Sequence, residues 1–481
     1  MTEINHLEPA VVWTHFATLC GIPRLSKQEG ALRGCLFDWA IARGLDSEID
    51  ASGNLLIRKP ASPGRDGRPG VILQAHLDMV CQANEGVAHD FSKDPIRPIE
   101  RDGWLLAEET TLGADNGIGV ALALAALEDV ALEHPALEVL LTVDEEAGMG
   151  GAHGLAPGVL RGSRMLNLDT EEWGEFYLGC AGGCDVAVSR HCRTETPPPD
   201  YKALRLRVAG LLGGHSGVDI HLGRGNANKM LVRLLRRIAK LTDLRLAKFS
   251  GGTARNALPR EAWADISLPR KDLEAIAGVL AEYQMLFRSE LAGTDDGVVL
   301  SWHPVDAAST IASSDQSDLL SALHAAPHGV YRMSAAFENV VETSNNLGVM
   351  GLADGSFSAN LMVRSLRESG TDLLAEEIAC LFTLAGCQVS VSGEYPGWTP
   401  NPHSPLLALC RAVFSREFEA EAKVQVIHAG LECGIIGAKY PAIDTVSFGP
   451  TIRGAHAPGE RVHIASVANS WRLLKAVLAE I

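Results

Sequence analysis

The sequence lacks three features, and each absence excludes a class of protein. No run of about 18 apolar residues occurs, so we expect no transmembrane helix and no membrane partner. Basic residues are outnumbered, with 42 Lys and Arg against 59 Asp and Glu, and the formal net charge of −17 argues against a nucleic-acid partner. The N-terminus also lacks the basic-then-apolar order that is typical of a secretory signal peptide.

The ten cysteines show no disulfide framework. Cys180 and Cys184 are separated by one residue too many for a CxxC pair, and no second pair completes a zinc knuckle. We therefore expect reduced thiols, and the sequence predicts a cytoplasmic protein.

At 481 residues the chain is long enough for two or three domains, and its 46% hydrophobic content is ordinary for a soluble protein with a large core. Strands alternate with helices near both ends of the chain, which predicts an α/β layer fold with a largely parallel sheet. Ser26 is predicted to cap a helix over 28–44. The expected strands of this part are 54–58, 71–75, 138–143, 165–168, 424–427 and 445–448.

The middle of the chain has a different pattern. The proline-rich stretch 194–200 suits a domain boundary, and alternating strands and amphipathic helices follow it. We expect one α/β domain, formed by residues 1–195 and 395–481, that is interrupted by an inserted α+β domain over 196–394.

Acidic residues and histidines gather where the predicted strands of the α/β domain end. Unpaired carboxylates are costly to hold at the ends of buried strands, and a divalent cation is the simplest explanation. Imidazole and carboxylate together suit first-row cations, above all zinc. The candidate residues are His76, Asp78, Asp115, Glu145, Glu146, Asp169 and His456.

Each candidate alone has an ordinary structural explanation. A single histidine at a strand end is usually a hydrogen-bonded structural residue, and Asp115 could simply cap the helix that follows it. Glu145 and Glu146 could form a solvated turn, and Asp78 could make a salt bridge. All these explanations must hold independently, so the coincidence of so many strand-end groups favours the metal site. A phosphate-binding loop at 113–119 is disfavoured, because the Walker and GxGxxG spacings are missing.

Several motifs resemble a known family, the two-zinc metallopeptidases related to aminoacylase and carboxypeptidase G. They are His76-Leu-Asp78, Leu112-Gly-Ala-Asp-Asn-Gly-Ile-Gly119, Glu145-Glu146-Ala-Gly148 and Asp169. Within that group, further motifs are similar to those of bacterial aminoacyl-histidine (Xaa-His) dipeptidases: Gly213-Gly-His-Ser-Gly217, Gly251-Gly-Thr-Ala-Arg-Asn-Ala-Leu-Pro259, His428-Ala-Gly-Leu-Glu-Cys-Gly434 and Gly449-Pro-Thr-Ile452.

The chain departs from the family pattern at two places. Asp144 stands where a neutral residue is expected, and Ala457-Pro-Gly-Glu460 replaces the more usual Ser-Pro-Asp-Glu. Neither departure removes a ligand. The extra acid could change the metal affinity or the pKa of Glu145.

The resemblance implies a two-zinc exopeptidase domain with an inserted lid and dimerisation domain, in a homodimer. It implies two divalent ions per subunit, zinc with manganese or cobalt as alternatives, and a cis peptide bond between Asp115 and Asn116. Asp115 would bridge the two ions. His76 and Asp169 would complete the ligands of one ion, and Glu146 and His456 would complete those of the other. Asp78 would orient the His76 ring.

The resemblance also implies a mechanism. A metal-bound hydroxide would attack the peptide bond, with Glu145 as general base and later general acid. The implied substrate residues are His215, Asn256, Arg364 and Gly430, with Arg364 binding the C-terminal carboxylate through its guanidinium. Without the resemblance, Arg364 would be taken as a surface strand residue.

The predicted activity is hydrolysis of unblocked dipeptides, Xaa-His peptides such as β-alanyl-histidine among them. An N-acyl-amino-acid amidohydrolase on the same scaffold is the alternative within enzymes, because the sequence does not describe the pocket for the amine side. A non-catalytic binding protein would require that a ligand or Glu145 be missing, and all are present.

Overall fold

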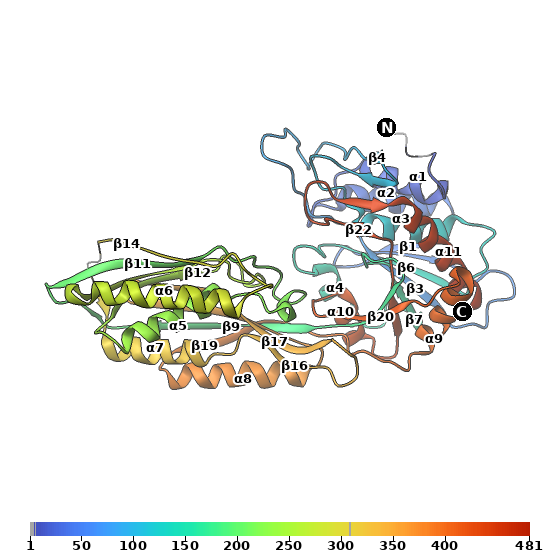
Figure 1. Cartoon of the computed structure of the whole chain (residues 1–481). Coiled ribbons are helices and arrows are strands. Elements are labelled where there is room, and N and C mark those ends of the chain that lie inside the picture. Colours follow the sequence, from blue (N-terminus) through green and yellow to red (C-terminus); the bar gives the residue numbers. More distant parts are fainter. Residues whose placement is uncertain (1–3, 5, 307–308) are drawn as a thin grey trace. The chain divides into compact units, whose positions relative to one another are not determined.

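The computed structural model describes residue 4, residues 6–306 and residues 309–481 (Figure 1). The chain divides into two compact units. Unit 1 comprises Met1–Gly179, Trp398–Val426 and Leu431–Ile481, and unit 2 comprises Cys180–Gly397 and Ile427–Gly430. The boundary expected at residues 195 and 196 falls inside unit 2, where the proline-rich stretch separates two strands of one sheet.

Unit 1 is built on an eight-stranded sheet in the order β1-β2-β6-β3-β7-β21-β8-β20. The four central strands, β6, β3, β7 and β21, pair in parallel, whereas β1, β2 and β8 make antiparallel pairs with their neighbours. The parallel core therefore matches the prediction, and the antiparallel edge strands were not foreseen. The strands are β1 (Asp46–Ile49), β2 (Leu55–Lys59), β3 (Val71–His76), β6 (Leu137–Thr142), β7 (Arg164–Asn167), β8 (Glu175–Cys180), β20 (Lys423–Ile427) and β21 (Asp444–Ser447).

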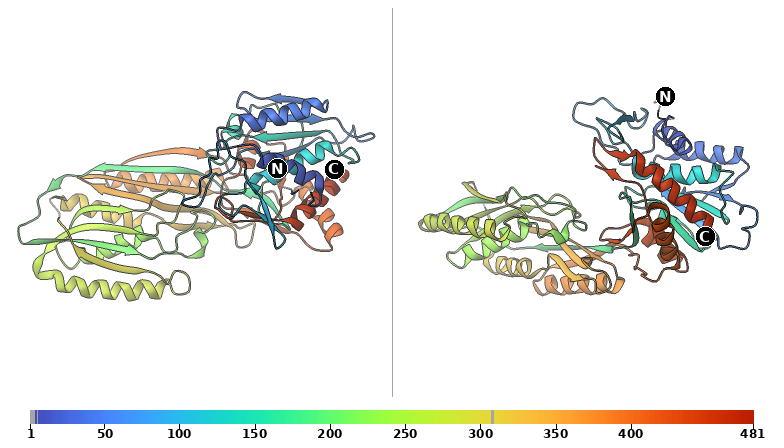
Figure 2. Two further views of the ribbon diagram at one scale, coloured as in Figure 1. Left: turned by 90° about the horizontal axis from the view of Figure 1, so that it is seen from above. Right: turned by 45° about the vertical axis from the view of Figure 1, so that its right-hand side comes forward.

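Helices cover both faces of this sheet, because alternate side chains of its strands are apolar on both faces. On one face, Leu73 and Val139 belong to the core formed with the larger helices, α1 (Ala10–Cys20), α2 (Gly30–Ala42), α3 (Ala114–Glu128), α9 (Pro405–Phe418) and α11 (Ile464–Glu480). Figure 2 shows α11, in red, alongside α3. On the other face, Ile72 and Leu140 pack with α4 (Gly150–Gly154) and α10 (Glu432–Lys439).

A small antiparallel sheet of unit 1 carries the loops next to α3. Its four strands lie in the order β22-β23-β5-β4. They are β4 (Ile99–Arg101), β5 (Trp104–Leu106), β22 (Ile452–Arg453) and β23 (Arg461–His463).

Unit 2 is an α+β unit with an antiparallel nine-stranded sheet, ordered β14-β11-β13-β12-β17-β18-β9-β19 with β16 paired to β17. Its strands are β9 (Gly182–His191), β11 (Tyr201–Ala209), β12 (Arg245–Gly251), β13 (Ala262–Pro269), β14 (Val299–Pro304), β16 (Gly329–Met333), β17 (Val341–Ala353), β18 (Ser356–Ser365) and β19 (Gln388–Tyr395), and a separate pair is formed by β10 (Thr194–Glu195) and β15 (Thr310–Ile311). One core joins the sheet to its α-helices, which are α5 (Ala227–Ala239), α6 (Leu273–Glu290), α7 (Ser313–Ala325) and α8 (Glu368–Leu384). Two 3₁₀ helices, η1 (Ile220–Leu222) and η2 (Arg270–Asp272), contribute no residue to this core.

The predicted role of Ser26 as a helix cap is wrong. Glu29 precedes α2, and the Ser26 hydroxyl instead donates a hydrogen bond of 2.7 Å to Oδ2 of Asp78. The serine therefore supports a residue at the end of β3 and not a helix. Among the helices described, none combines the length and apolar character that a membrane crossing requires.

Candidate metal centre

The candidate ligands meet at the carboxyl ends of the parallel strands of unit 1. His76 is the last residue of β3, Glu146 follows β6, and Asp169 follows β7. Since parallel strands end at the same edge of a sheet, these three side chains converge, as open α/β sheets commonly arrange their sites. Asp115 comes from the first turn of α3, and His456 from the loop between β22 and β23.

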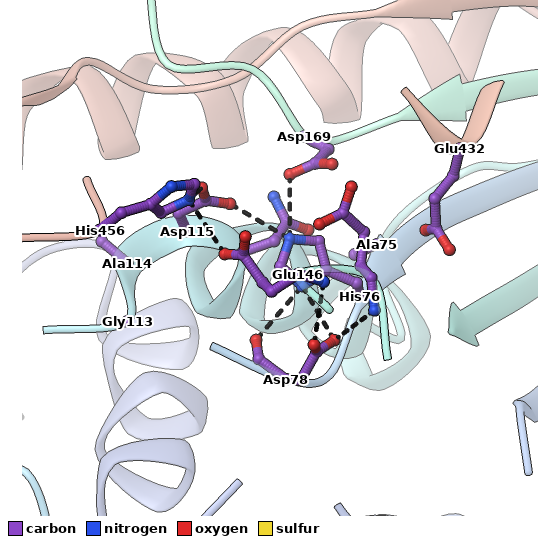
Figure 3. A network of polar contacts seen from close by, with 12 residues as sticks. Ala75, His76, Asp78, Gly113, Ala114, Asp115, Glu146, Asp169, Glu432 and His456 are labelled. Carbon is purple, nitrogen blue, oxygen red and sulfur yellow. Dashed lines mark hydrogen bonds and ion pairs between the residues drawn. The ribbon is translucent and has the colours of Figure 1, made fainter. Parts of the chain in front are cut away.

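Asp115 lies at the middle of the cluster, between the two histidines (Figure 3). Its Oδ1 is 3.2 Å from Nε2 of His76, and its Oδ2 is 3.1 Å from Nε2 of His456. Gly113 occupies the N-cap position of α3, and the Asp115 carboxylate instead faces the two imidazoles, so Asp115 is not the cap of this helix. The Asp115–Asn116 peptide bond is cis, which confirms the expectation from the resemblance.

The remaining two acids each face one histidine. Oδ1 of Asp169 lies 3.4 Å from Nε2 of His76, and Oε1 of Glu146 lies 3.1 Å from Nε2 of His456. Ligand atoms of His76, Asp115 and Glu146 all lie within 4.8 Å of one another. Asp169 and Glu146 thus contact different histidines, and Asp115 contacts both, an arrangement that suits two ions bridged by Asp115.

Asp78 holds the His76 ring from the side opposite the cluster. Nδ1 of His76 lies 3.4 Å from Oδ1 of Asp78 and 3.2 Å from its carbonyl oxygen, which leaves Nε2 directed at Asp115. The Asp78 carboxylate also accepts the backbone N–H groups of Glu145 (3.0 Å) and Glu146 (3.1 Å). One buried carboxylate thus fixes both the ring of a candidate ligand and the turn that carries two acids.

The acids of the cluster raise the pKa of both histidines. Hydrogen bonds that the His456 ring donates to the carboxylates of Asp115 and Glu146 raise its pKa to about 11. Burial alone would lower the pKa of His76, but Asp169, Asp115 and Asp78 raise it well above its ordinary value. The acids of the cluster therefore favour the charged form of both imidazoles.

Glu145 is an acid of the cluster whose ionisation is opposed by burial. Burial raises its pKa well above the ordinary value, and the carboxylates of Asp169, Glu432 and Glu146 add to this effect against the opposing charge of His76. A carboxyl group with a raised pKa beside a metal site suits proton transfer near neutral pH.

The donor set fits a pair of divalent cations. Three carboxylates with two imidazolium groups leave the cluster with a charge of −1, whereas three carboxylates, two neutral imidazoles and two dications give +1. Oxygen and nitrogen ligands in this mixture suit zinc and similar first-row ions.

Two glycines in the first turns of α3 lie where a side chain would collide with neighbouring groups. A side chain at Gly119 would approach the carbonyl oxygen of Leu168 to 2.6 Å, and one at Gly117 would approach the Phe16 ring to 2.9 Å. These residues allow α3 to pack closely between β7 and α1.

The four substrate residues implied by the resemblance belong to unit 2. Arg364 lies on β18 and is only 4% exposed, so the view of it as a surface residue is wrong. Its Nη1 donates to the Tyr395 hydroxyl at 2.7 Å. Burial and the nearby charge of Arg364 lower the pKa of His215 to about 4, so this imidazole is neutral at physiological pH.

Asn256 and Gly430 lie in segments next to the His215 loop. The carbonyl oxygen of Asn256 accepts the N–H of Ser216 at 2.8 Å. A side chain at Gly217 would collide with the carbonyl oxygen of His428, two residues before Gly430. The His215 loop thus lies against the buried Arg364 side chain, which a side chain at Gly217 would approach to 3.1 Å.

Three buried charged residues near the centre were not predicted as functional. Arg24 and Glu460 are each 2% exposed, and Glu432 is fully buried on the strand face that carries His76. The Glu432 carboxyl accepts hydrogen bonds from Gln74 (2.7 Å) and Thr142 (2.5 Å). A lone acid within the apolar run 431–436 is a signal that could have revealed it.

The structure shows the surroundings of the two departures from the family pattern. Asp144 points toward Lys27, with 4.0 Å between Oδ2 and Nζ. Gly459 adopts φ +87°, a left-handed conformation that glycine accepts without a steric cost, and Glu460 is retained beside it.

Comparison with known proteins identifies the family. The model of Peptidase family M20/M25/M40 matches residues 72–480, so the chain belongs to this family of peptidases. The cytosol non-specific dipeptidase of Escherichia coli K12 is 45% identical over 483 residues, covering 100% of this chain and 99% of that protein. The crystal structure of the aminoacylhistidine dipeptidase from Vibrio alginolyticus is 44% identical, with a TM-score of 0.91 and coverage of 100% of this chain and 98% of that one.

A more distant structure shares the fold alone. The aminopeptidase PepT of Bacillus cereus ATCC 10987 has 16% identity and a TM-score of 0.57, covering 98% of this chain and 99% of that one. The family match and the similarity to the Vibrio structure confirm the α/β fold class and the recognition of a peptidase family.

Proposed function

We propose that the protein is a metal-dependent dipeptidase that hydrolyses unblocked dipeptides, Xaa-His peptides such as β-alanyl-histidine among them. The observation that carries this proposal is the position of Asp115, whose two oxygens face His76 and His456 at 3.2 and 3.1 Å. The full-length similarity to dipeptidases supports the same activity.

Two divalent ions, zinc above all and manganese or cobalt as alternatives, would be held by His76, Asp169 and the shared Asp115 on one side, and by Glu146, His456 and Asp115 on the other. When bound, such ions lower the pKa of a water molecule to about 7 and polarise the scissile carbonyl. Without metal, the imidazoles of His76 and His456 would take up protons. Metal binding would therefore release protons.

Glu145 serves as the proton carrier. Its raised pKa suits a group that accepts the proton of the attacking water and then gives it to the leaving amine. Asp78 assists by fixing the His76 ring and by binding the backbone N–H of Glu145, which holds the base in place.

The substrate contacts come from His215, Asn256, Arg364 and Gly430. A neutral His215 is able to donate a hydrogen bond to the developing oxyanion without an excess charge. The buried guanidinium of Arg364 suits the substrate carboxylate, because fork-shaped donors bind carboxylates in pairs. Unit 2, corresponding to the insert expected over 196–394, would act as lid and dimerisation surface of a cytoplasmic homodimer.

A comparison of two substrates tests the proposal. Chelator-treated protein reconstituted with zinc should cleave β-alanyl-histidine faster than N-acetyl-histidine, and the chelated protein should cleave neither. Faster release of acetate would favour the amidohydrolase alternative. Full activity without metal would contradict the proposal as a whole.

A further inference from the structure

The segment Leu112–Asp115, which carries the shared candidate ligand, lies between two buried groups of opposite charge. The Glu460 carboxylate meets its backbone N–H groups, and the Arg24 guanidinium meets one of its carbonyl groups. Since buried charges are costly, two of them on one short segment call for an explanation.

Glu460 accepts four backbone hydrogen bonds from this segment. Its Oε2 accepts the N–H groups of Leu112 (2.8 Å) and Gly113 (2.9 Å), and its Oε1 accepts those of Ala114 (2.7 Å) and Asp115 (3.3 Å). Glu460 also lies only four residues after His456, in the turn that β23 follows. One carboxylate therefore ties the backbone of Asp115 to the turn that carries His456.

Arg24 makes the corresponding link to the end of β3. Its Nη2 donates to the carbonyl oxygen of Gly113 at 2.5 Å, and its Nη1 donates to those of Leu77 (3.0 Å) and Asp78 (3.1 Å). These carbonyl groups directly follow His76 in the chain. The guanidinium thus joins the segment of Asp115 to the strand end of His76.

We propose that Glu460 and Arg24 are positioning residues for metal binding, which together set the spacing of His76, Asp115 and His456 before any ion arrives. The inference rests on the proposed function, because it assigns these three side chains as ligands. Neither residue touches the ions or the substrate in this proposal. Each acts through backbone groups next to a ligand.

The simpler alternative is that Glu460 only stabilises the first turn of α3, where carboxylates are favourable. If that were its only role, a substitution of Glu460 would lower the stability of the fold but would leave the affinity for metal unchanged. The two roles are therefore separated by comparing metal affinity at matched stability.

Glu138 offers a matched control in the same unit. It is a buried acid, 5% exposed, whose Oε2 accepts the backbone N–H groups of Arg161 and Gly162 at 2.7 Å each. It lies near the start of β6, at the opposite end of that strand from Glu146. Glu138→Gln removes the same kind of contact at a distance from the centre, together with an ion pair to Arg58 at 3.1 Å.

The experiment measures zinc affinity and urea unfolding for chelator-treated wild type, Glu460→Gln and Glu138→Gln. Zinc is titrated in competition with a chromophoric chelator. The amide nitrogen that Glu460→Gln introduces cannot accept a hydrogen bond, so at least one pair of N–H groups loses its acceptor. We expect Glu460→Gln to weaken zinc binding by about 10- to 100-fold, a typical effect of residues behind metal ligands. Glu138→Gln should destabilise the fold and keep the wild-type affinity.

Arg24→Lys is the second variant, because an ammonium group cannot reach three carbonyl oxygens in the geometry of a guanidinium fork. It should also weaken zinc binding. Wild-type affinity in Glu460→Gln, or an equal loss in Glu138→Gln, would overturn the inference. Failure of both Glu460→Gln and Arg24→Lys to fold would also overturn it, because their role would then be the fold itself. A wild-type protein that binds no zinc would overturn the proposed function instead.

Discussion

Asp115 and His456 are separated by 341 residues in the sequence, yet Nε2 of His456 lies 3.1 Å from Oδ2 of Asp115. The contact exists because the turn after β22 folds back over the start of α3, where Glu460 binds the backbone of the preceding loop. His456 itself adopts φ +65°, a conformation that non-glycine residues rarely take outside functional or turn positions. His456 thus takes a left-handed turn conformation, and its ring faces Asp115.

Glu145→Gln should retain the metal ions and lose catalysis. Glutamine keeps the shape of the side chain but cannot accept and return a proton, so kcat should fall by at least about 10²- to 10⁴-fold. Steady-state kinetics with metal analysis of the same sample checks this. Substantial turnover in the variant would show that Glu145 is not the base.

Asp78→Asn should weaken zinc binding and lower kcat together. The amide leaves the side-chain volume unchanged, but it removes the negative charge that faces Nδ1 of His76 and one of the acceptors for the N–H groups of Glu145 and Glu146. A loss of about 10- to 100-fold in metal affinity is expected. If the zinc affinity and kcat of the variant were unchanged, Asp78 would not be needed to orient His76 and Glu145.

The raised pKa of the Glu432 carboxyl should make the stability of the protein depend on pH in an unusual way. Burial raises the pKa of this carboxyl from 4.5 to about 8, with contributions from Asp169 and Asp78, against the opposing effects of Thr142 and His76. Between these two pKa values the folded protein keeps a proton that the unfolded chain has lost. The free energy of unfolding contributed by this group therefore falls as pH rises from about 4.5 to 8, with a slope of at most about 1.4 kcal/mol per pH unit.

Glu432→Gln isolates this effect, because glutamine resembles the protonated acid. Urea unfolding of the chelator-treated proteins should give similar stabilities near pH 5 and a growing advantage for the variant toward pH 8. Parallel pH profiles for the two proteins would show that Glu432 does not carry the raised pKa.

Asp144→Asn should change little, although the acid is unusual for the family. Asparagine tolerates the left-handed backbone at this position, where φ is +59°. The ion pair with Lys27 is long and its lysine is largely exposed, so its loss should cost at most about 1 kcal/mol. Zinc titration and unfolding of the variant measure both effects. A clear change in zinc affinity would show that the acid does act on the centre.

Three of the candidate ligands could be predicted from the sequence because they follow predicted parallel strands, which end at the same edge of a sheet. His76, Glu146 and Asp169 each follow a short apolar run, and parallel strands bring such positions together whatever the loops between them do. Asp115 and His456 were also candidates from the residues alone, but only the family resemblance gave Asp115 its role as the residue shared by two ions.

The supporting charges could not be predicted in the same way. Arg24 and Glu460 are buried by segments that are remote in the sequence, and a charged residue in a loop is usually solvated. The antiparallel edge strand β1 was missed because its sequence, Asp46-Ser-Glu-Ile49, is mostly polar and exposed. The proline-rich stretch 194–200 suggested a boundary, yet unit 2 begins with β9, whose Val186 and Val188 pack in the core of the unit 2 sheet.

The most direct measurement is the zinc content of chelator-treated wild type and Asp115→Asn after reconstitution with zinc and removal of the excess. Because Asp115 is shared by both groups of ligands, the account predicts two tightly bound ions per chain in the wild type and the loss of both affinities in the variant. A wild type that retains no zinc, or an Asp115→Asn protein that retains two ions as tightly as the wild type, would contradict it.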